Sequence, residues 1–386
     1  MVARLSATAT HRKSGRPRAL VLAPTRELVN QINDVIIPLA HSAGLNTVTV
    51  FGGVSQVRQV NTLTKGVDIV VACPGRLEDL IGQGFVSLDS IEITVIGEAD
   101  HMADLGFLPA VTRLLKQIPH SSQKMLFSAT LDNGVDRLVA AFLTNAVLHS
   151  VDDETSHVDE MTHHVFEVST DNKKALIREL AAGRGKRILF TRTKHQAKKL
   201  AKQLTAQGIP AVDLHGNLSQ SKRDKNLAAF GSGKIRVLVA TDVAARGVHV
   251  DSVELVVHVD PPAESKSYLH RSGRTARAGH AGDVVTIVLP EQRKDTAILL
   301  RKASINIRPV RVIPSSTAVA DLVGERAPYV KPIPQQLSPG KSGNGKSQGT
   351  NAQRKRAARM GKQISNSHRS SSARANASSN TRLSRG

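Results

Sequence analysis

The chain has 386 residues, and its hydrophobic fraction of 40% is enough to give two ordinary domains a core each. Lys and Arg number 53 against 32 Asp and Glu, and the net charge of +21 favours a polyanion such as nucleic acid over a small neutral substrate, unless the surface is merely soluble and basic. The single cysteine, Cys73, excludes an intramolecular disulfide and a four-cysteine zinc site, and no apolar run is long enough to cross a membrane, so a cytoplasmic protein is expected.

The first block of alternating elements follows residues 1–18, which are basic and show no pattern of secondary structure. Short β-branched runs then alternate with helical stretches as far as residue 148. Near-continuous apolar strands between helices predict an α/β domain with a parallel sheet covered on both faces. The expected strands lie at 19–23, 48–53, 68–72, 93–97 and 124–130.

A second α/β block at residues 163–312 repeats the first, and the acidic stretch at 149–162 is expected to be the linker between them. "ALVLAPTREL" aligns with "RILFTRTKHQ", and "DIVVACPGR" aligns with "RVLVATDVAARG". Two copies of one unit is the simplest explanation, although any two such domains would give a weaker match. The expected strands lie at 163–168, 187–191, 211–215, 236–241, 255–260 and 283–289.

The periodicity ends near residue 312, and residues 313–386 are expected to form a disordered basic tail. Residues 331–386 contain 12 Lys or Arg and no acidic residue, together with abundant Ser, Gly, Asn and Gln. Such a segment can tether RNA electrostatically, or it can serve only to keep the protein in solution.

Small residues and arginines follow the strands of the first block, where the ligands of open parallel sheets bind. "PTREL" follows the first strand, "GG" the second and "CPGR" the third, and each could contact a phosphate chain. "GEAD" follows the fourth strand and "SAT" the fifth. A carboxylate in this position is suited to Mg²⁺ and water activation, whereas an acidic cap of a helix is the alternative.

The second block contains "ATDVAARG" and "HRSGRTARAG". Arg271, Arg274 and Arg277 in the latter are spaced to share one face of a helix. Three guanidinium groups on one face repel one another unless an anion lies among them, so phosphate is the expected partner. A solvated basic helix face is the alternative.

The ordered series "PTREL", "GG", "CPGR", "GEAD", "SAT", "LHGNLSQSKR", "ATDVAARG" and "HRSGRTARAG" resembles the DEAD-box family of ATP-dependent RNA helicases over residues 19–312. The resemblance implies two tandem RecA-like domains, ATP and Mg²⁺ as cofactors, and RNA bound through its sugar-phosphate backbone. Contacts of that kind agree with the scarcity of aromatic side chains for base stacking, since the chain has no Trp and only 2 Tyr.

The resemblance also implies the roles of particular residues. RNA contacts would come from Thr25, Arg26, Gly53, Pro74, Gly75 and Arg76 in the first domain, and from Gly216, Gln220, Arg223 and Thr241 in the second. Glu98 would activate water, while Asp100 would couple to Ser128, Thr130 and His270. The nucleotide would be contacted by Asp242, Arg246, Gly247, Arg274 and Arg277, and the last two would meet its γ-phosphate.

Two departures from the family pattern concern the chemistry. The residues that precede "PTREL" contain no G-x-x-x-x-G-K-[ST] loop, which in the family lies there and holds the β- and γ-phosphates. Gly97 stands where the family has an Asp associated with Mg²⁺, and glycine offers no ligand. We therefore expect the first domain to be an incomplete RecA-like domain in an N-terminally shortened chain, and loss of its interior strand to expose two strand edges and make it fold poorly.

The sequence therefore predicts a homologue of the ATP-dependent RNA helicases in which RNA binding is retained and ATP hydrolysis is lost. The alternatives are a non-catalytic RNA-binding protein and the product of a disrupted helicase gene. A helicase that acts on DNA remains a further alternative, because backbone contacts alone do not identify a reader of the 2′-hydroxyl.

Overall fold

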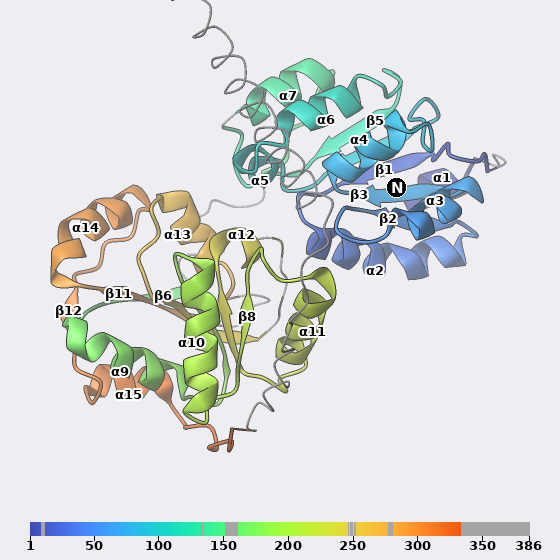
Figure 1. Cartoon of the computed structure of the whole chain (residues 1–386). Helices are drawn as coiled ribbons and strands as arrows, with labels where there is room; N and C mark the ends of the chain where they lie inside the picture. Colours follow the sequence, from blue (N-terminus) through green and yellow to red (C-terminus); the bar gives the residue numbers. More distant parts are fainter. Residues whose placement is uncertain are drawn as a thin grey trace, which may run out of the picture. The chain divides into compact units, whose positions relative to one another are not determined.

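The computed structural model describes residues 1–8, 12–132, 134–150, 161–245, 247, 250, 252–276 and 281–332. It contains two parallel sheets that follow one another along the chain (Figure 1). The predicted α/β class and the tandem arrangement of two parallel-sheet domains are confirmed.

The first sheet has five strands in the order β2-β3-β1-β4-β5, all of them parallel. Each of its strands corresponds to an apolar run expected from the sequence. β1 at the centre is buried at every position because helices cover both faces, which explains its unbroken apolar sequence. The strands are β1 (Ala19–Leu22), β2 (Thr47–Val50), β3 (Ile69–Ala72), β4 (Ile93–Ile96) and β5 (Gln123–Leu126).

Two apolar clusters pack on the opposite faces of this sheet. One face packs on α1 and α2, and the other packs on α3 to α7. The helices are α1 (Val2–Ser6), α2 (Arg26–Ser42), α3 (Gln56–Thr64), α4 (Pro74–Gly82), α5 (Ala99–Asp104), α6 (Leu108–Leu115) and α7 (Val135–Phe142).

Residues 1–18 were expected to show no secondary structure, and this prediction is wrong for the first few of them, which form α1. Leu5 is completely buried in the cluster that also contains Val29 of α2. The helix is only five residues long, too short to give a periodic signal in the sequence. Leu5, together with the partly buried Met1 and Val2, therefore attaches α1 to the first domain.

The prediction that a missing interior strand would leave two exposed strand edges inside the sheet is also wrong. β1, β4 and β5 are hydrogen-bonded neighbours, so the sheet has no gap, and its outer strands are β2 and β5. β5 is the least buried strand of this sheet, and Phe127, which follows it, is 60% exposed. Apolar side chains are also exposed away from β5, among them Val35 and Leu39 of α2.

The second sheet has seven parallel strands in the order β12-β6-β11-β10-β7-β9-β8. β6 begins at Met161, two residues before the expected start of this domain, and most of the predicted acidic linker lies outside the described residues. The strands are β6 (Met161–Glu167), β7 (Lys186–Phe190), β8 (Ala211–Leu214), β9 (Val237–Ala240), β10 (Val253–His258), β11 (Gly282–Val288) and β12 (Val310–Arg311).

Helices again cover both faces of the second sheet. α9, α10 and α15 pack on one face, whereas α11 and α12 pack on the other. A smaller cluster joins α13 and α14 to β6 and β11. The helices are α9 (Thr170–Ala181), α10 (Lys194–Ala206), α11 (Gln220–Gly231), α12 (Asp242–Ala245), α13 (Ser265–Ser272), α14 (Arg293–Lys302) and α15 (Thr317–Val323), with a 3-10 turn at Pro290–Gln292.

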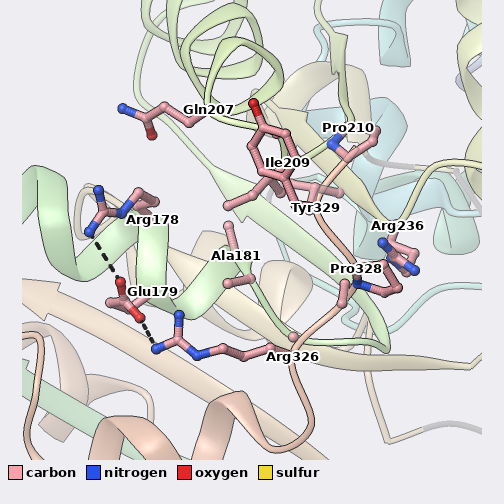
Figure 2. A pocket seen from close by; sticks show the side chains of 15 residues that line it. Arg178, Glu179, Ala181, Gln207, Ile209, Pro210, Arg236, Arg326, Pro328 and Tyr329 are labelled. Atoms are coloured by element: carbon pink, nitrogen blue, oxygen red, sulfur yellow. Dashed lines mark hydrogen bonds and ion pairs between the residues drawn. The ribbon is translucent and has the colours of Figure 1, made fainter. Parts of the chain in front are cut away.

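The tail expected from residue 313 begins later than predicted, because residues 317–330 form a C-terminal strap on the second domain. Val319 and Val323 of α15 are buried against α9, and the segment after α15 continues across the domain. Arg326 forms an ion pair with Glu179 of α9 (Figure 2). Residues 333–386, on which the rest of that prediction falls, lie outside the described residues.

A buried aromatic cluster beneath α13 contains two histidines. His163 Nδ1 lies 2.8 Å from the hydroxyl of Tyr268, and the rings of His258 and Tyr268 meet edge to face with centroids 4.8 Å apart. Burial lowers the pKa of His163 to about 4 and the pKa of His258 well below its ordinary value. Both imidazoles are therefore neutral in the folded domain at neutral pH.

The two neutral histidines predict that acid destabilises the second domain. The unfolded chain takes up these protons near pH 6.5, whereas the folded domain resists them, so the free energy of unfolding falls as the pH drops from 6.5 towards 4. His163 alone contributes up to about 3 kcal/mol of this loss, at about 1.4 kcal/mol per pKa unit. Urea unfolding followed by tyrosine fluorescence reports on this domain alone, because Tyr268 and Tyr329 both lie in it and the chain has no Trp.

The matched variants are His163→Gln, which removes one of the buried titrating groups, and His120→Gln, which changes an exposed histidine of the first domain. The first is expected to flatten the dependence on pH between 6.5 and 4, and the second to leave it unchanged. An equally steep dependence in all three proteins would contradict this assignment.

Candidate nucleic-acid and nucleotide site

The predicted RNA contacts of the first domain lie at the edge of its sheet where the carboxyl ends of the strands meet. Thr25 caps α2, since its Oγ1 accepts a hydrogen bond from the backbone N–H of Leu28 at 3.3 Å. The Arg26 guanidinium lies directly over Gly53, where φ is +78° and a Cβ atom would overlap Arg26 Nη1. The backbone conformation therefore favours glycine at position 53, and a Cβ there would push the Arg26 guanidinium aside.

The loop after β3 begins α4 with the remaining predicted contacts. Pro74 occupies the first turn of α4, Gly75 is exposed, and Arg76 Nε lies 3.4 Å from Asp79 Oδ2. Cys73 precedes them as the N-cap residue, and burial raises the pKa of its thiol to about 12. Its thiol is thus held in the protonated form, so position 73 adds no negative charge to this edge.

The second domain presents its predicted RNA contacts at the carboxyl ends of β8 and β9. Gly216 is exposed in the loop after β8, and Gln220 and Arg223 lie in the first turn of α11. Thr241 follows β9, where its carbonyl accepts the backbone N–H groups of Ala244 and Ala245. The strands are parallel, so these groups lie along one edge of the sheet.

Hydrogen bonds join the two sets of predicted RNA contacts. Arg26 Nη1 donates to Gln220 Oε1 at 3.0 Å. Glu27, which the sequence analysis did not single out although it belongs to "PTREL", accepts from Gln220 Nε2 at 3.0 Å and from Arg223 Nε at 2.7 Å. Burial raises the pKa of Glu27, but its contacts with Arg223 and Gln220 outweigh burial and hold the pKa below its usual value.

The acidic pair after β4 has an unusual backbone. Glu98 precedes α5 in the left-handed conformation, with φ 49° and ψ 55°, which a residue other than glycine rarely adopts. Its carboxylate accepts a hydrogen bond from His101 Nδ1 at 3.0 Å. Burial raises the pKa of Glu98, but His101, Arg274 and His270 together lower it below its usual value. Glu98 is therefore an ionised carboxylate, as a base that activates water must be.

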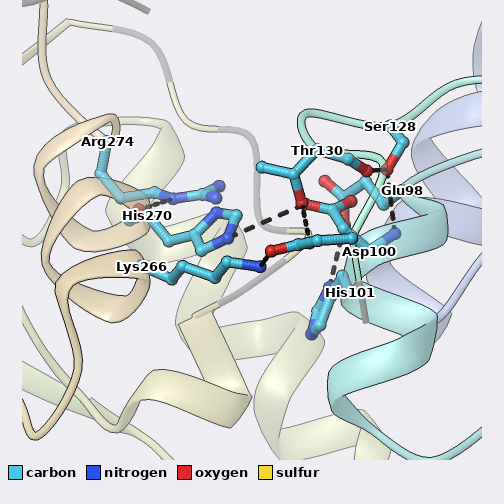
Figure 3. A network of polar contacts seen from close by, with 9 residues as sticks. Glu98, Asp100, His101, Ser128, Thr130, Lys266, His270 and Arg274 are labelled. Carbon is cyan, nitrogen blue, oxygen red and sulfur yellow. Dashed lines mark hydrogen bonds and ion pairs between the residues drawn. The ribbon is translucent and has the colours of Figure 1, made fainter. Parts of the chain in front are cut away.

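Asp100 lies in a network that connects the two domains (Figure 3). Its backbone N–H donates to Ser128 Oγ at 3.1 Å, and Ser128 Oγ donates to the carbonyl of Thr130 at 2.6 Å. His270 Nε2 of α13 lies 4.0 Å from Asp100 Oδ2. The structure thus brings together the four residues that the sequence predicted to couple, but Ser128 contacts the backbone of Asp100 and not its carboxylate.

An ion pair that the sequence analysis missed extends this network. Thr130 Oγ1 donates to Asp132 Oδ1 at 2.6 Å, and the other oxygen of Asp132 is paired with Lys266 at the start of α13 (Figure 3). These contacts lower the pKa of Asp132. Asp132 lies two residues beyond "SAT", and no pattern in the sequence distinguishes it from other surface acids.

The predicted row of three arginines can be followed only in part, because Arg277 lies outside the described residues. α13 ends at Ser272, and a turn follows in which the backbone N–H of Arg274 donates to the carbonyl of Arg271 at 3.2 Å. Arg271 is 3% exposed and is paired with Asp242, with Nη2 2.8 Å from Oδ2. Its guanidinium also lies 5.3 Å from the centre of the Phe190 ring. Arg271 therefore holds α13 and α12 together, and its charge is already balanced by a carboxylate.

The other predicted nucleotide contacts are placed only in part. Arg274 Nε donates to the carbonyl of His270 at 3.2 Å, and Arg274 lowers the pKa of Glu98. Gly247, with φ +69°, approaches Thr25 so closely that a Cβ atom would overlap Thr25 Oγ1. Arg246 and Arg277 lie outside the described residues.

The residues at the acidic pair do not fit a magnesium site of the expected kind. Gly97 offers no side-chain ligand, and the carboxylate of Glu98 is turned to His101. Within the described ranges, no group of three His, Cys, Asp or Glu side chains is suited to holding a metal ion.

Among the residues that the structure describes, no helix is both long and apolar enough to cross a membrane.

Two family models match the chain. Residues 1–138 match the DEAD/DEAH box helicase model, and residues 171–279 match the helicase conserved C-terminal domain. The first match begins at residue 1, so it includes the segment that the sequence analysis took to be an unpatterned remnant. Residues beyond 279, including the C-terminal strap, belong to neither match.

Relatives with the same motifs come from bacteria and plants. The ATP-dependent RNA helicase RhlB of Pseudomonas syringae pv. tomato is 38% identical over 276 residues, which cover 70% of each chain. The chloroplastic DEAD-box ATP-dependent RNA helicase 3B of Zea mays is 40% identical over 300 residues, which cover 76% of this chain. The chain spans about 40% of the length of the maize relatives it matches.

A solved structure with the same two-domain fold is Dbp5 of Saccharomyces cerevisiae bound to RNA and ADP BeF3. It is 26% identical to this chain, with a TM-score of 0.70, and the match covers 84% of this chain and 86% of Dbp5.

Proposed function

Because this chain belongs to the DEAD-box family of ATP-dependent RNA helicases, we propose that it binds RNA through the sugar-phosphate backbone and that these 386 residues do so without hydrolysing ATP. In the family activity, ATP turnover is coupled to local strand separation. Here the RNA-directed groups are present in both domains, whereas the groups for ATP hydrolysis are incomplete.

RNA binding is supported by the hydrogen bonds that join the predicted RNA contacts of the first domain to those of the second. Arg26 Nη1 and Gln220 Oε1 are 3.0 Å apart although they belong to different domains. A strand of RNA along these edges would contact guanidinium groups and main-chain amides beside Gly53 and Gly75, and few aromatic rings. Contacts of this kind recognise phosphate and sugar, so little sequence preference is expected.

Gly53→Ala is expected to weaken RNA binding about tenfold, which corresponds to about 1.4 kcal/mol. An alanine at φ +78° is strained, and its Cβ would displace the Arg26 guanidinium from Gln220. Fluorescence anisotropy with a labelled, unstructured RNA of twenty nucleotides measures the affinity. Gly52→Ala is the matched control, because a Cβ at position 52 would meet no atom within 4 Å. Equal affinity of both variants would show that this loop does not contact RNA.

The ATP-directed half of the proposal depends on two separate features of the first domain. No G-x-x-x-x-G-K-[ST] loop precedes "PTREL" to hold phosphates, since the string of that spacing at residues 340–347 lies outside both family matches. In addition, Gly97 supplies no oxygen for Mg²⁺. The residues that remain, Arg274 and Glu98 among them, could contact a nucleotide but do not complete a site for its metal-bound phosphates. Each deficiency alone would impair hydrolysis, so repairing one leaves the other.

RNA-stimulated ATPase activity is therefore expected at background for the unmodified chain and equally for Gly97→Asp. The substitution is sterically acceptable, because a Cβ at Gly97 would meet only the Leu22 carbonyl oxygen, at 3.7 Å. Phosphate release with and without RNA measures the activity. Glu98→Gln is the control for contaminating ATPases, since a rate that it leaves unchanged does not come from this site. Turnover in the unmodified chain that Glu98→Gln abolishes would refute the proposal.

The second candidate is a non-catalytic RNA-binding protein with no use of nucleotide at all. It is favoured by the paired state of Asp242, both oxygens of which contact Arg271. Equilibrium binding of a fluorescent ATP analogue separates the two candidate functions, because only the helicase homologue is expected to retain measurable affinity for the analogue.

A cytoplasmic location is also proposed from the single cysteine, and cell fractionation tests it.

A further inference from the structure

A groove of about 290 Å³ lies on the second domain between the C-terminal strap and the residues that precede β8 (Figure 2). Its walls include the ends of α9 and α10, Pro210 before β8 and Arg236 before β9. Tyr329 of the strap, 69% exposed, stands over one side of the groove. The strap therefore converts the surface of the domain into a concave site.

The strap is held closely enough to give this groove a fixed shape. The backbone N–H of Val330 donates to the carbonyl of Gly208 at 3.0 Å, and that of Ala327 donates to Ala182 at 2.8 Å. The ring of Tyr329 lies against Gly208, where φ is +82° and a Cβ atom would overlap the ring. The aromatic wall thus depends on a glycine at position 208.

The charged side chains of the groove favour an anionic ligand. Arg178, Arg236 and Arg326 line it, and Glu179 is the one acidic residue among its lining residues. The two oxygens of Glu179 are already paired with Arg178 and Arg326. No ion pair of Arg236 occurs within the part of the chain that the structure describes. The lining carries a net charge of +2, from three arginines and one glutamate.

The groove lies away from the predicted RNA contacts. Pro210 and Arg236 precede the amino ends of β8 and β9, whereas Gly216 and Thr241 follow their carboxyl ends. Four residues of strand separate the two edges by roughly 13 Å. RNA bound at the carboxyl edge would have to turn around the domain to reach the groove. A second macromolecule could therefore occupy the groove while RNA is bound.

We propose that this groove is a docking site for a short acidic segment of a partner protein, with carboxylates directed to Arg236 and Arg326 and a side chain packed against Tyr329 and Pro210. The strap residues that form it lie outside both family matches. The opposite wall, with Arg178, Pro210 and Arg236, lies within the match to the helicase conserved C-terminal domain. The proposed site is independent of whether the chain hydrolyses ATP.

The test is selection from a displayed library of random dodecapeptides on the full chain, run in parallel on two variants. Arg236→Gln removes the arginine without a carboxylate partner, and Arg301→Gln removes an exposed arginine of α14 as the matched control. Peptides enriched on the unmodified chain are then synthesised without Tyr or Trp. Their affinity is measured by anisotropy, and quenching of Tyr329 gives a second signal.

The expected peptides carry at least two carboxylates, lose about tenfold or more in affinity on Arg236→Gln and on Tyr329→Ala, and bind Arg301→Gln and the RNA-saturated chain unchanged. Tyrosine fluorescence of Arg236→Gln checks that the domain remains folded. The proposal is overturned if no peptide is enriched, if enriched peptides are neutral or basic, or if Arg236→Gln binds them equally. It is also overturned if RNA displaces them, or if RNA affinity itself falls tenfold in Arg236→Gln, which would assign the groove to nucleic acid.

Discussion

Replacing Arg187 with leucine is expected to lower the free energy of unfolding of the second domain by about 3–5 kcal/mol, because several carbonyls lose their donor at about 1–3 kcal/mol each. Arg187 is 2% exposed. Its guanidinium donates to Leu180 O at 2.8 Å and to Val323 O at 2.8 Å, which are carbonyls at the carboxyl ends of α9 and α15. It also donates to Gly185 O and Leu322 O.

One buried cation thus caps two helices at the ends where their dipoles favour positive charge. Leucine fills the same space but leaves these carbonyls without donors in the protein interior, and each such group costs about 1–3 kcal/mol. The strap, which α15 attaches to the domain, should loosen at the same time.

Urea unfolding monitored by tyrosine fluorescence measures this effect in the second domain alone, because the first domain has no Tyr or Trp. Arg184→Gln is the matched control three residues away. It removes an ion pair with Glu325 whose two side chains are 59% and 68% exposed, and such pairs contribute about 0–1 kcal/mol. A loss below about 1 kcal/mol for Arg187→Leu would contradict the capping role.

The affinity for RNA is expected to fall about 100-fold between 50 and 200 mM monovalent salt. Neutralising roughly four to six phosphates of a single strand gives a logarithmic slope of about −3 to −4. The cations available include Arg26 and Arg76 at the first sheet, with Arg223 shared with Glu27. Residues 331–386 add 12 Lys or Arg without a compensating acid.

Anisotropy titrations at four or more salt concentrations, with RNAs of two unrelated sequences, give this slope directly. The two sequences should give the same slope and affinities within a few-fold of each other. A chain that ends at Lys331 separates the contribution of the folded domains from that of the following segment. A slope near zero would mean that phosphate contacts do not govern binding.

The strands could be predicted from the sequence because a strand that is buried on both faces consists of an uninterrupted run of apolar residues. β1 and β9 are buried at every position, so each reads as an uninterrupted apolar run between helices. The positions of Thr25, Gly53 and Thr241 followed from this, because ligand contacts in parallel sheets lie where strands end. Short elements give no such pattern, since α1 has only five residues and β12 has only two.

The burial of two arginines could not be predicted from the sequence. Sequence spacing indicates that Arg271 and Arg274 are near each other, but it does not indicate which guanidinium turns inward. Arg271 pairs with Asp242, and Arg187 caps two helices, so both are internal in spite of their charge. The C-terminal strap was missed because only two side chains of α15, Val319 and Val323, are buried.

The central claim is that these residues bind RNA without hydrolysing ATP, and because the site for the metal-bound phosphates is incomplete, ATP is not expected to change RNA affinity either. Measuring RNA affinity with and without ATP and Mg²⁺ at constant salt tests this most directly. Gly97 and the missing phosphate loop predict one affinity in both conditions, the same for Gly97→Asp as for the unmodified chain. An increase of tenfold or more in RNA affinity when ATP and Mg²⁺ are added to the unmodified chain would contradict the claim.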